Sequence, residues 1–340
     1  MLIKSIQAAV LQLCVVICLL QANTVFAATY KIATISPDGL SWMKKLRTGV
    51  KKIETDTGGR VKFKIYPGGV QGDDDTVLRK MRIGQLHGGA VAAGSLTRFY
   101  PDLQIYNLPL QFRSYDEVDY VRQKMDPSIA DGLAASGIVT FAFSETGFAY
   151  LMSQTPVTTV AELKSLKPWI PDNDPIAAEL VKAFGVSPIP LNITDVLAGL
   201  QTGLINAVVA PPSVALALQW HNHVAYMTDL PLVYIYSMLA MDSKAFGRIS
   251  ESDKMIVRSE MDAVFTEVEN DNRLDNEKAY EAMKAIGIKS IAANKIEEWR
   301  AVADESIRNL IASGEITPES VQSYLENLRD YRDESAAGSE

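Results

Sequence analysis

The chain has 340 residues, 47% of them hydrophobic and 22% charged, with a formal net charge of -8. An acidic chain offers no basic surface to nucleic acid or to an anionic membrane, so binding to either is not expected. The length exceeds the roughly 250–300 residues that one hydrophobic core usually holds, which predicts two lobes.

An export signal is predicted over residues 1–27. Lys4 gives it a positively charged start, residues 8–20 are apolar, and residues 25–27 (Val-Phe-Ala) fit the small-residue rule for cleavage. The apolar run is shorter than the about 20 residues that span a bilayer. Cleavage is therefore expected, with an uncleaved anchor as the alternative.

Both cysteines, Cys14 and Cys18, lie inside this signal. Neither follows a small residue, which argues against a lipoprotein attachment site. The mature chain therefore has no cysteine, so disulfides and thiol catalysis are excluded and packing alone must stabilise it. An exported chain of this kind is expected in the bacterial periplasm.

The first mature segment alternates strands and helices, which is typical of a mostly parallel sheet covered by helices. The expected elements are strands over 30–35, 61–66, 87–92, 138–144 and 239–242 and helices over 41–57, 74–83 and 115–124.

A second, smaller α/β unit is predicted between residues 160 and 226. It has a strand near Trp169, and its other expected elements are helices over 175–184 and 193–202 and a strand over 207–210. The chain then returns to the first unit. Two crossings, near 145–153 and 234–241, predict a hinge of two strands.

The C-terminal third is amphipathic with helical spacing. Ser250 followed by Asp253 resembles a capping box, and the pattern continues to about Ala285. A helix of about 34 residues is about 50 Å long, so we expect it to brace both lobes. Two more helices are expected after Asn294 and Thr317.

Patterns that would indicate other chemistry are weak. The Gly-Gly pairs at 68–69 and 88–89 lack the spacing of phosphate loops. His221 and His223 have no third ligand nearby in sequence, whereas a metal site needs three or four. Residues 73–75 (Asp-Asp-Asp) lack the calcium-loop pattern and are better explained as a helix start. No hydrolase motif is present, so we expect no enzyme, metal or cofactor.

A series of short motifs, weak singly, occurs in a fixed order: 57–61 (Thr-Gly-Gly-Arg-Val), 66–69, 71–73, 108–113, 147–148, 160–167 and 198–203. With them the chain resembles the substrate-binding subunits of TRAP transporters, the DctP-like family of extracytoplasmic solute receptors. The resemblance covers essentially the whole mature chain. It implies two α/β lobes that close over a small ligand.

The resemblance and the periodicity together predict one fold: α/β, a two-lobed periplasmic binding protein fold with crossing hinge strands and a long C-terminal brace helix. The expected parts are a signal over 1–27, the first lobe over 28–150, the second lobe over 151–236, the return to the first lobe with the brace and last helices over 237–333, and a disordered tail over 334–340.

The chain departs from the family pattern where the family binds a substrate carboxylate. Trp169 stands in place of an arginine that pairs with that carboxylate, and Ala149 stands where a second arginine often follows the Gly-Phe motif. Ala210 replaces an asparagine. Without a guanidinium, burying a ligand carboxylate would cost several kcal/mol, so we expect a hydrophobic or aromatic ligand.

The residues expected to contact this ligand are Trp42, Gln71, Phe148, Trp169, Asn192, Val209, Ala210, Pro211, Tyr234 and Tyr236. The aromatic rings offer apolar faces, and Gln71 and Asn192 are the polar candidates. Packing in the hinge is the alternative for Phe148, and packing in a helix core is the alternative for Trp42.

The sequence thus predicts a periplasmic solute-binding protein that delivers a small ligand to the membrane subunits of a TRAP-type transporter. The divergent pocket resembles that of a subgroup associated with apolar ligands and with a periplasmic tetratricopeptide-repeat protein, a candidate second partner. The alternative is a carrier or sensor of lipid-like molecules that serves no transporter and acts through a periplasmic partner.

Overall fold

The structure, a computed structural model, describes residues 27–172 and 174–337. The predicted export signal, except for Ala27, therefore lies outside the described residues. Within the described part of the chain, no helix is both long and apolar enough to cross a membrane.

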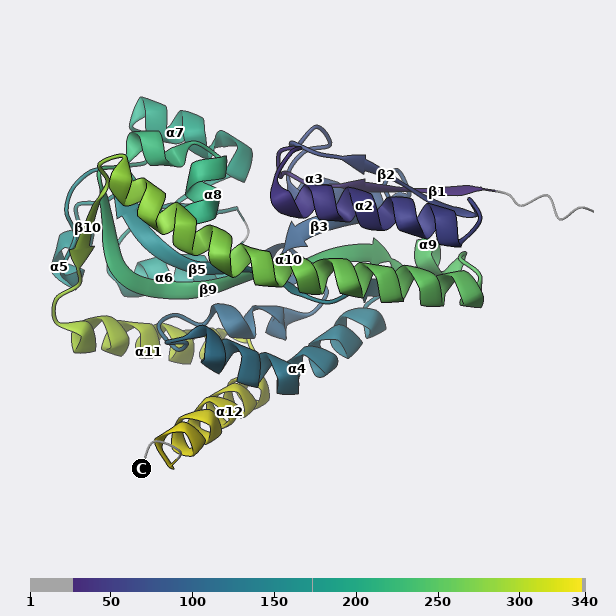
Figure 1. Cartoon of the computed structure of the whole chain (residues 1–340). Helices are drawn as coiled ribbons and strands as arrows, with labels where there is room; N and C mark the ends of the chain where they lie inside the picture. The colour runs from purple at the N-terminus through teal and green to yellow at the C-terminus, as the bar shows by residue number, and fades with distance from the viewer. Residues whose placement is uncertain (1–26, 173, 338–340) are drawn as a thin grey trace, which may run out of the picture.

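One eight-stranded mixed sheet runs through the molecule (Figure 1). Its main path is, in spatial order, β2 (Val61–Tyr66), β1 (Ala28–Ala33), β3 (Gly88–Ala92), β9 (Tyr226–Asp242), β5 (Ser144–Ser153) and β8 (Ala207–Ala210). Strand β1 pairs in parallel with β2 and β3, as the sequence predicts for the first lobe. Strands β4 (Ile138–Thr140) and β10 (Lys289–Ala292) also pair with β9.

Strands β5 and β9 form the predicted hinge. They pair antiparallel from Ser144 opposite Ser237 to Ser153 opposite Tyr226, with three register irregularities on the way. One end of β9 pairs with β3 of the first lobe, and β8 of the second lobe pairs with β5. Because both strands are continuous through this region, each carries the chain from one lobe to the other.

Helices cover the first-lobe part of the sheet. They are α2 (Ser41–Asp56), α3 (Asp74–Arg82), α4 (Tyr115–Ala135) and α9 (Ser243–Gly247), with the 3-10 turns η1 (Ala93–Leu96) and η2 (Pro101–Asn107). Helix α3 begins as expected, because the Asp73 side chain accepts a hydrogen bond from the backbone N–H of Thr76 at 2.8 Å. Helix α4 continues well beyond the predicted residue 124, through Pro127.

The second lobe has its own small sheet, in which β6 (Trp169–Pro171) pairs in parallel with β7 (Ile189–Leu191). Its helical elements are α5 (Val160–Leu163), α6 (Pro175–Ala183), η3 (Ile193–Asp195), α7 (Val196–Thr202), α8 (Pro212–Ala217) and η4 (Trp220–His223). The two histidines of the chain's His-Asn-His segment thus lie on a single turn.

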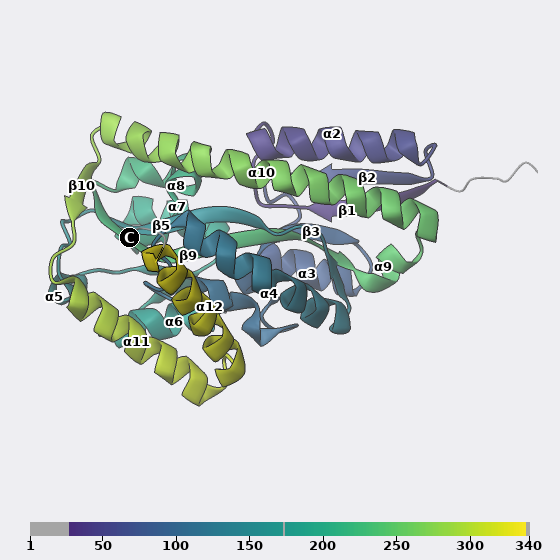
Figure 2. The ribbon, with the colours of Figure 1, turned by 60° about the horizontal axis from the view of Figure 1, so that its bottom comes forward.

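The brace helix α10 spans Glu251–Ala285 and confirms the prediction at both ends. The Ser250 hydroxyl accepts a hydrogen bond from the backbone N–H of Asp253 at 3.2 Å, which caps the helix. The helix packs against α2 in the first lobe and against α8 in the second. Figures 1 and 2 show it running along both lobes.

The last two helices differ slightly from the prediction. Helix α11 (Ile296–Ser313) starts after Lys295, which has a positive φ of 54°. Asn294, the expected start, lies one residue earlier, and its backbone carbonyl accepts a hydrogen bond from the Trp299 indole N–H. Helix α12 spans Pro318–Ala337, so residues 334–337, expected in a disordered tail, are helical. In this last turn, the Glu334 carboxylate accepts a hydrogen bond from the Tyr120 hydroxyl of α4 at 3.0 Å. The sequence pattern does not predict this tertiary contact.

Candidate functional site

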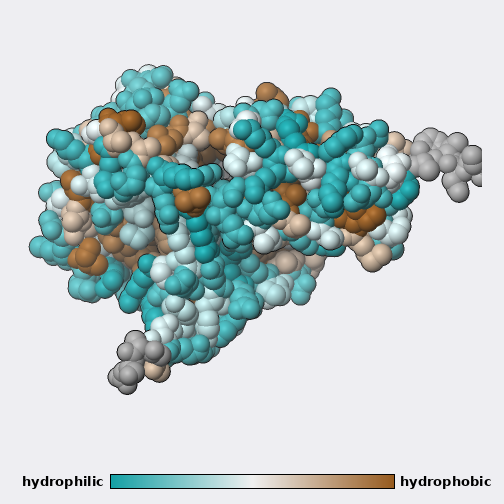
Figure 3. All heavy atoms as spheres, in the orientation of Figure 1, coloured by the Kyte–Doolittle hydropathy of each residue, from teal (hydrophilic) through white to brown (hydrophobic). Residues whose placement is uncertain are grey.

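A cavity of about 710 Å³ lies between the two lobes. The first lobe contributes the loop after β1, the start of α3 and the segment from β3 to η1, and the second lobe contributes the ends of β6 and β8 and helix α8. The hinge strands and α10 complete the wall. Figure 3 shows a mostly hydrophilic surface with hydrophobic side chains in the recess between the lobes.

Several aromatic side chains contribute to the cavity wall. Trp169 and Trp220 meet edge to face, with ring centroids 5.1 Å apart and planes at 70°. The Trp169 indole N–H donates to the Leu191 carbonyl at 2.9 Å, which fixes the ring between β6 and β7. Trp42 from α2 and Phe265 from α10 line the same space. These rings are largely buried and give this part of the wall an apolar, aromatic character.

Small residues stand where strand β8 reaches the cavity. Val209, Ala210 and Pro211 line it, and Ala210 pairs with Tyr150 of the hinge strand β5. Because Ala210 ends at its Cβ and Pro211 precedes α8, this part of the wall leaves room for a ligand. Asn192, just before η3, lines the cavity from the second lobe.

Three residues predicted to contact the ligand lie outside the cavity lining: Gln71, Phe148 and Tyr234. The Gln71 side chain accepts a hydrogen bond from Lys80 at 2.9 Å. Phe148 and Tyr234 pack on each other in the first-lobe core, with centroids 5.6 Å apart, so the hinge-packing alternative holds for Phe148. The Tyr234 hydroxyl accepts from Arg122 at 3.2 Å.

Strand alternation explains this placement. Side chains of successive strand residues point to opposite faces. Tyr234 and Tyr236 share the face that packs into the first-lobe core, whereas Ile235 and Ser237 belong to the other face, and both line the cavity. Tyr236 also borders the cavity, but its hydroxyl donates to the Leu103 carbonyl.

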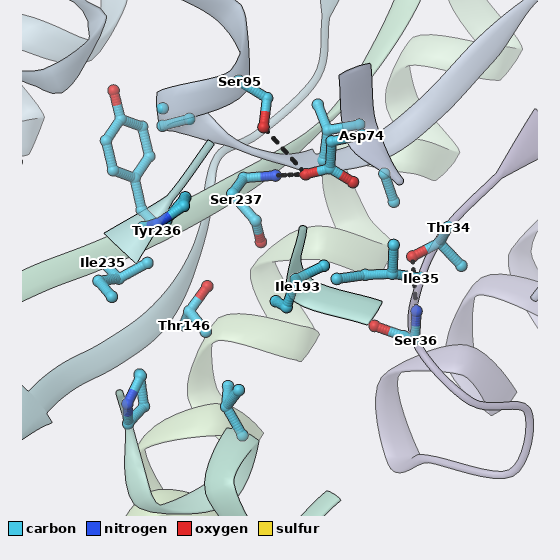
Figure 4. Close-up of a pocket in the computed structure, with 18 of the residues that line it drawn as sticks. Thr34, Ile35, Ser36, Asp74, Ser95, Thr146, Ile193, Ile235, Tyr236 and Ser237 are labelled. Atoms are coloured by element: carbon cyan, nitrogen blue, oxygen red, sulfur yellow. Dashed lines mark hydrogen bonds between the residues drawn. The ribbon is translucent and has the colours of Figure 1, made fainter. Parts of the chain in front are cut away.

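Sequence reasoning missed several lining residues, including Thr146, Ile193, Trp220 and Ile235, and it assigned Asp74 only a structural role. Figure 4 shows the Asp74 carboxylate beside Ser95 among the lining side chains. Its Oδ2 accepts hydrogen bonds from the Ala92 N–H at 2.9 Å and from the Ser95 hydroxyl at 3.1 Å. Burial raises the pKa of Asp74 to about 6, against the effect of these two donors.

A charge network with one buried carboxylate lies at the hinge. The Glu145 side chain in β5 is fully buried, and Arg273 of α10 donates to its Oε2 at 2.9 Å. Arg273 also donates to Asp119 of α4 at 2.9 Å through Nη1. The network ties the brace helix and α4 to the hinge strand. Among the described residues, no group of three metal-ligating side chains is positioned to hold a metal ion.

Residues 32–313 match the model of a protein family described as bacterial extracellular solute-binding protein, family 7 (DctP). The chain belongs to this family. The predicted membership in the DctP-like family is thereby confirmed, and the family is one of solute receptors rather than enzymes.

Curated relatives of this DctP-family chain match it over part of their length. A solute-binding protein of Roseobacter denitrificans is 22% identical over 67% of this chain and 70% of its own length. The C4-dicarboxylate-binding periplasmic protein DctP of Rhodobacter capsulatus is 29% identical over 47% of this chain. The chain spans 48% of that relative and 66% of an uncharacterized protein of Salmonella typhimurium, to which it is 24% identical.

Solved TRAP periplasmic structures share the fold over nearly their whole length. The sugar acid binding protein of Advenella mimigardefordensis, in complex with galactonate, superposes with a TM-score of 0.83 at 18% identity, covering 89% of this chain and 98% of that one. A TRAP periplasmic solute-binding protein of Desulfovibrio salexigens with bound orotic acid gives 0.81 at 18% identity, with 89% and 99% covered. The predicted two-lobed fold is confirmed.

Proposed function

We propose that this protein is the periplasmic solute-binding component of a TRAP-type uptake transporter and that it delivers its ligand to the membrane subunits. The ligand is small and has a hydrophobic or aromatic body, which lies between the lobes against Trp169. The observation that carries the proposal is the tryptophan-lined cavity between two lobes in a chain of the DctP family.

The ligand class follows from what stands at position 169. An arginine at this position would offer two coplanar N–H donors to a carboxylate. Trp169 has a single N–H, and that group already donates to the Leu191 carbonyl. An aromatic ligand body of about 200 Å² buried against this wall contributes about 5 kcal/mol, at about 25 cal/mol per Å². A ligand with an apolar body is therefore favoured over a purely hydrophilic acid.

The hinge supports a transport role for such binding. Two strands and the brace helix join the lobes, so a ligand that contacts both lobes favours the closed arrangement over the open one. The closed form is the one proposed to meet the membrane subunits. A tetratricopeptide-repeat partner, and the alternative of a carrier that serves no transporter, stay predictions from the sequence.

The first experiment is native mass spectrometry of the protein purified from its periplasm, followed by organic extraction of the bound molecule. A stoichiometric compound with an apolar or aromatic body is expected. Recovery of a small hydrophilic acid would overturn the proposed ligand class. Uptake of the extracted compound by cells that contain the membrane subunits, and loss of uptake when this protein is deleted, would separate transport from the carrier alternative.

Two variants test the role of Trp169. Trp169→Arg is expected to lose the extracted ligand, because it replaces an apolar face with a guanidinium. Leu204→Arg is the matched control, since it adds the same charge to an exposed position of the second lobe outside the cavity lining. Unchanged ligand identity and affinity in Trp169→Arg would contradict the proposal.

A further inference from the structure

One carboxylate oxygen in the cavity wall has no partner. Asp74 lies in the first turn of α3, and its Oδ2 accepts the two hydrogen bonds from Ala92 and Ser95. Its Oδ1 is buried and accepts none. Asn107, at the end of η2, lines the same cavity, and its Oδ1 is also buried and unpartnered. Both orphan atoms are hydrogen-bond acceptors.

Such atoms are costly unless something donates to them. Leaving a buried acceptor without a donor is unfavourable, and more so when the acceptor is charged. The neighbouring carboxylates do not share this need, because Asp73 accepts from Thr76 as the helix cap and Asp75 pairs with Arg98 at 3.7 Å. Burial, with repulsion from Asp73 and Asp75, raises the pKa of Asp74. A donor brought by a ligand would remove this cost.

The charges around the cavity define what kind of donor fits. Six of the described lining residues are carboxylates: Asp73, Asp74, Asp75, Asp172, Asp174 and Asp275. The cationic side chains among the described lining residues are Arg79, which donates to Thr76 at 2.6 Å, and Arg98, which pairs with Asp75. An anionic ligand would meet net negative charge, whereas a cation would be attracted.

The aromatic wall suits a cation as well as an apolar body. A positively charged nitrogen group over the face of a tryptophan within about 6 Å is attracted by the ring's electron density. Trp42, Trp169 and Trp220 all line the cavity. A single molecule can therefore place an apolar body against the indoles and a charged nitrogen against the carboxylate.

We propose that the ligand carries a protonated amine or amidine group and that the Asp74 carboxylate binds this group by accepting hydrogen bonds from its N–H donors. Asp74 is then a specificity-determining residue of the cavity. The inference rests on the proposed function, because it concerns the ligand of that same cavity. It separates this protein from relatives whose bound molecules are acids, such as galactonate and orotic acid.

The test compares three probes that share one phenyl body and differ in charge: phenethylamine, 2-phenylethanol and phenylacetate. Each is titrated at neutral pH into the mature protein, which has been unfolded and refolded to remove bound molecules. Three of the four tryptophans line the cavity, so intrinsic fluorescence reports binding, and calorimetry provides the second measurement. Phenethylamine is expected to bind at least about tenfold more tightly than either other probe.

Asp74→Asn keeps an oxygen for Ala92 and Ser95 but removes the charge, so it should fold. It is expected to weaken phenethylamine binding at least about tenfold and to leave 2-phenylethanol binding unchanged. Asp116→Asn is the matched control, because Asp116 also lies in the first turn of a helix, α4, but is exposed and outside the cavity lining. This control should bind all three probes as the unmodified protein does.

The outcomes separate the two proposals. Equal binding of the three probes, or tighter binding of phenylacetate, would overturn the amine inference and leave the aromatic ligand class standing. No binding of any probe up to about 10 mM would overturn both proposals. If Asp74→Asn fails to fold, the molecule extracted from the unmodified protein tests the inference instead. A basic nitrogen in that molecule supports the inference, and a molecule without one overturns it.

Discussion

The side-chain amide of Asn276 packs directly against Gly147, where an added Cβ would lie 2.5 Å from Nδ2. Gly147 lies in the hinge strand β5 with a φ of +117°, at one of the register irregularities, and Asn276 lies in the brace helix α10. The amide donates to the Thr146 carbonyl at 2.7 Å, and its oxygen accepts from the Ser213 hydroxyl at 2.8 Å. One side chain thus joins the hinge, the brace and the second lobe.

Gly147→Ala is expected to destabilise the protein by about 3 kcal/mol, because it combines a strained backbone with a clash against Asn276. Urea unfolding measures the loss. Gly287→Ala is the control, since Gly287 has a similar φ of +104° but nothing within 4 Å of its added Cβ. Gly287→Ala should cost about 1–2 kcal/mol. Equal losses in the two variants would contradict a specific contact at Gly147.

Asn276→Ala is expected to cost about 2–3 kcal/mol, because it removes a buried amide and leaves the half-buried Thr146 carbonyl and Ser213 hydroxyl without their partner. Hydrogen exchange should also accelerate in α8, which this side chain ties to the brace. Asn309→Ala serves as the control, since the Asn309 amide donates to Glu179 in an exposed hydrogen bond, and its loss should be below about 0.5 kcal/mol. Unchanged exchange in α8 would show that Asn276 does not couple the lobes.

Glu145 makes the stability of the fold depend on pH. Burial raises the pKa of this side chain to about 7, despite the lowering effect of Arg273, whereas an unfolded glutamate titrates near about 4.3. The folded state therefore holds the proton more tightly, and the stabilisation it gains below about pH 4.5 is lost as pH rises toward 7.

Glu145→Gln is expected to flatten this part of the stability curve between pH 5 and pH 7, to be checked by urea midpoints at both ends of about that range. Asp74, whose pKa is also raised, contributes in the same direction and is present in both proteins. The exposed Glu297 supplies the control variant Glu297→Gln. The same slope in Glu145→Gln and the unmodified protein would refute the assignment.

Arg60, which directly precedes strand β2, forms an ion pair with Asp253 at the start of the brace helix. Its guanidinium donates twice to the buried Asp253 carboxylate, at 2.9 and 2.7 Å, and holds the pKa of Asp253 below its usual range. Arg60→Lys keeps the charge but loses the paired geometry, so it should lower the midpoint of thermal unfolding. Lys62→Ala, which removes an exposed ion pair with Glu54, should cost less than about 0.5 kcal/mol.

Local signals were enough to predict the brace helix. Ser250 caps its start, the apolar spacing continues without a breaker to Ala285, and both features act within one turn of the chain. Local signals could not predict which side chains of the hinge strand β9 face the cavity. Which of Tyr234 and Ile235 faces the cavity depends on register, and register between β5 and β9 shifts at three irregularities.

In the candidate site, too, local motifs predicted some residues, whereas others depend on long-range contacts. The family motifs brought Trp169 and Ala210 to the cavity wall, because each follows a motif of fixed length. Asp74 looked like part of a helix start, and Asp73 does act as the cap. The partners that turn Asp74 toward the cavity, Ala92 and Ser95, are 18 and 21 residues away in sequence. Pairing over that distance is fixed by the assembled sheet, not by local pattern.

The pairing of β3 with β9 also determines when the chain can fold. Gly88 lies opposite Met241, and Leu46 of α2 packs in one cluster with Val257 and Met261 of the brace. A chain that ends at residue 150 therefore lacks the strand that pairs with β3 and the helix that covers α2. Contacts of such long sequence separation form slowly and late. We therefore expect the first lobe to complete its packing only after β9 and the brace helix have been synthesised.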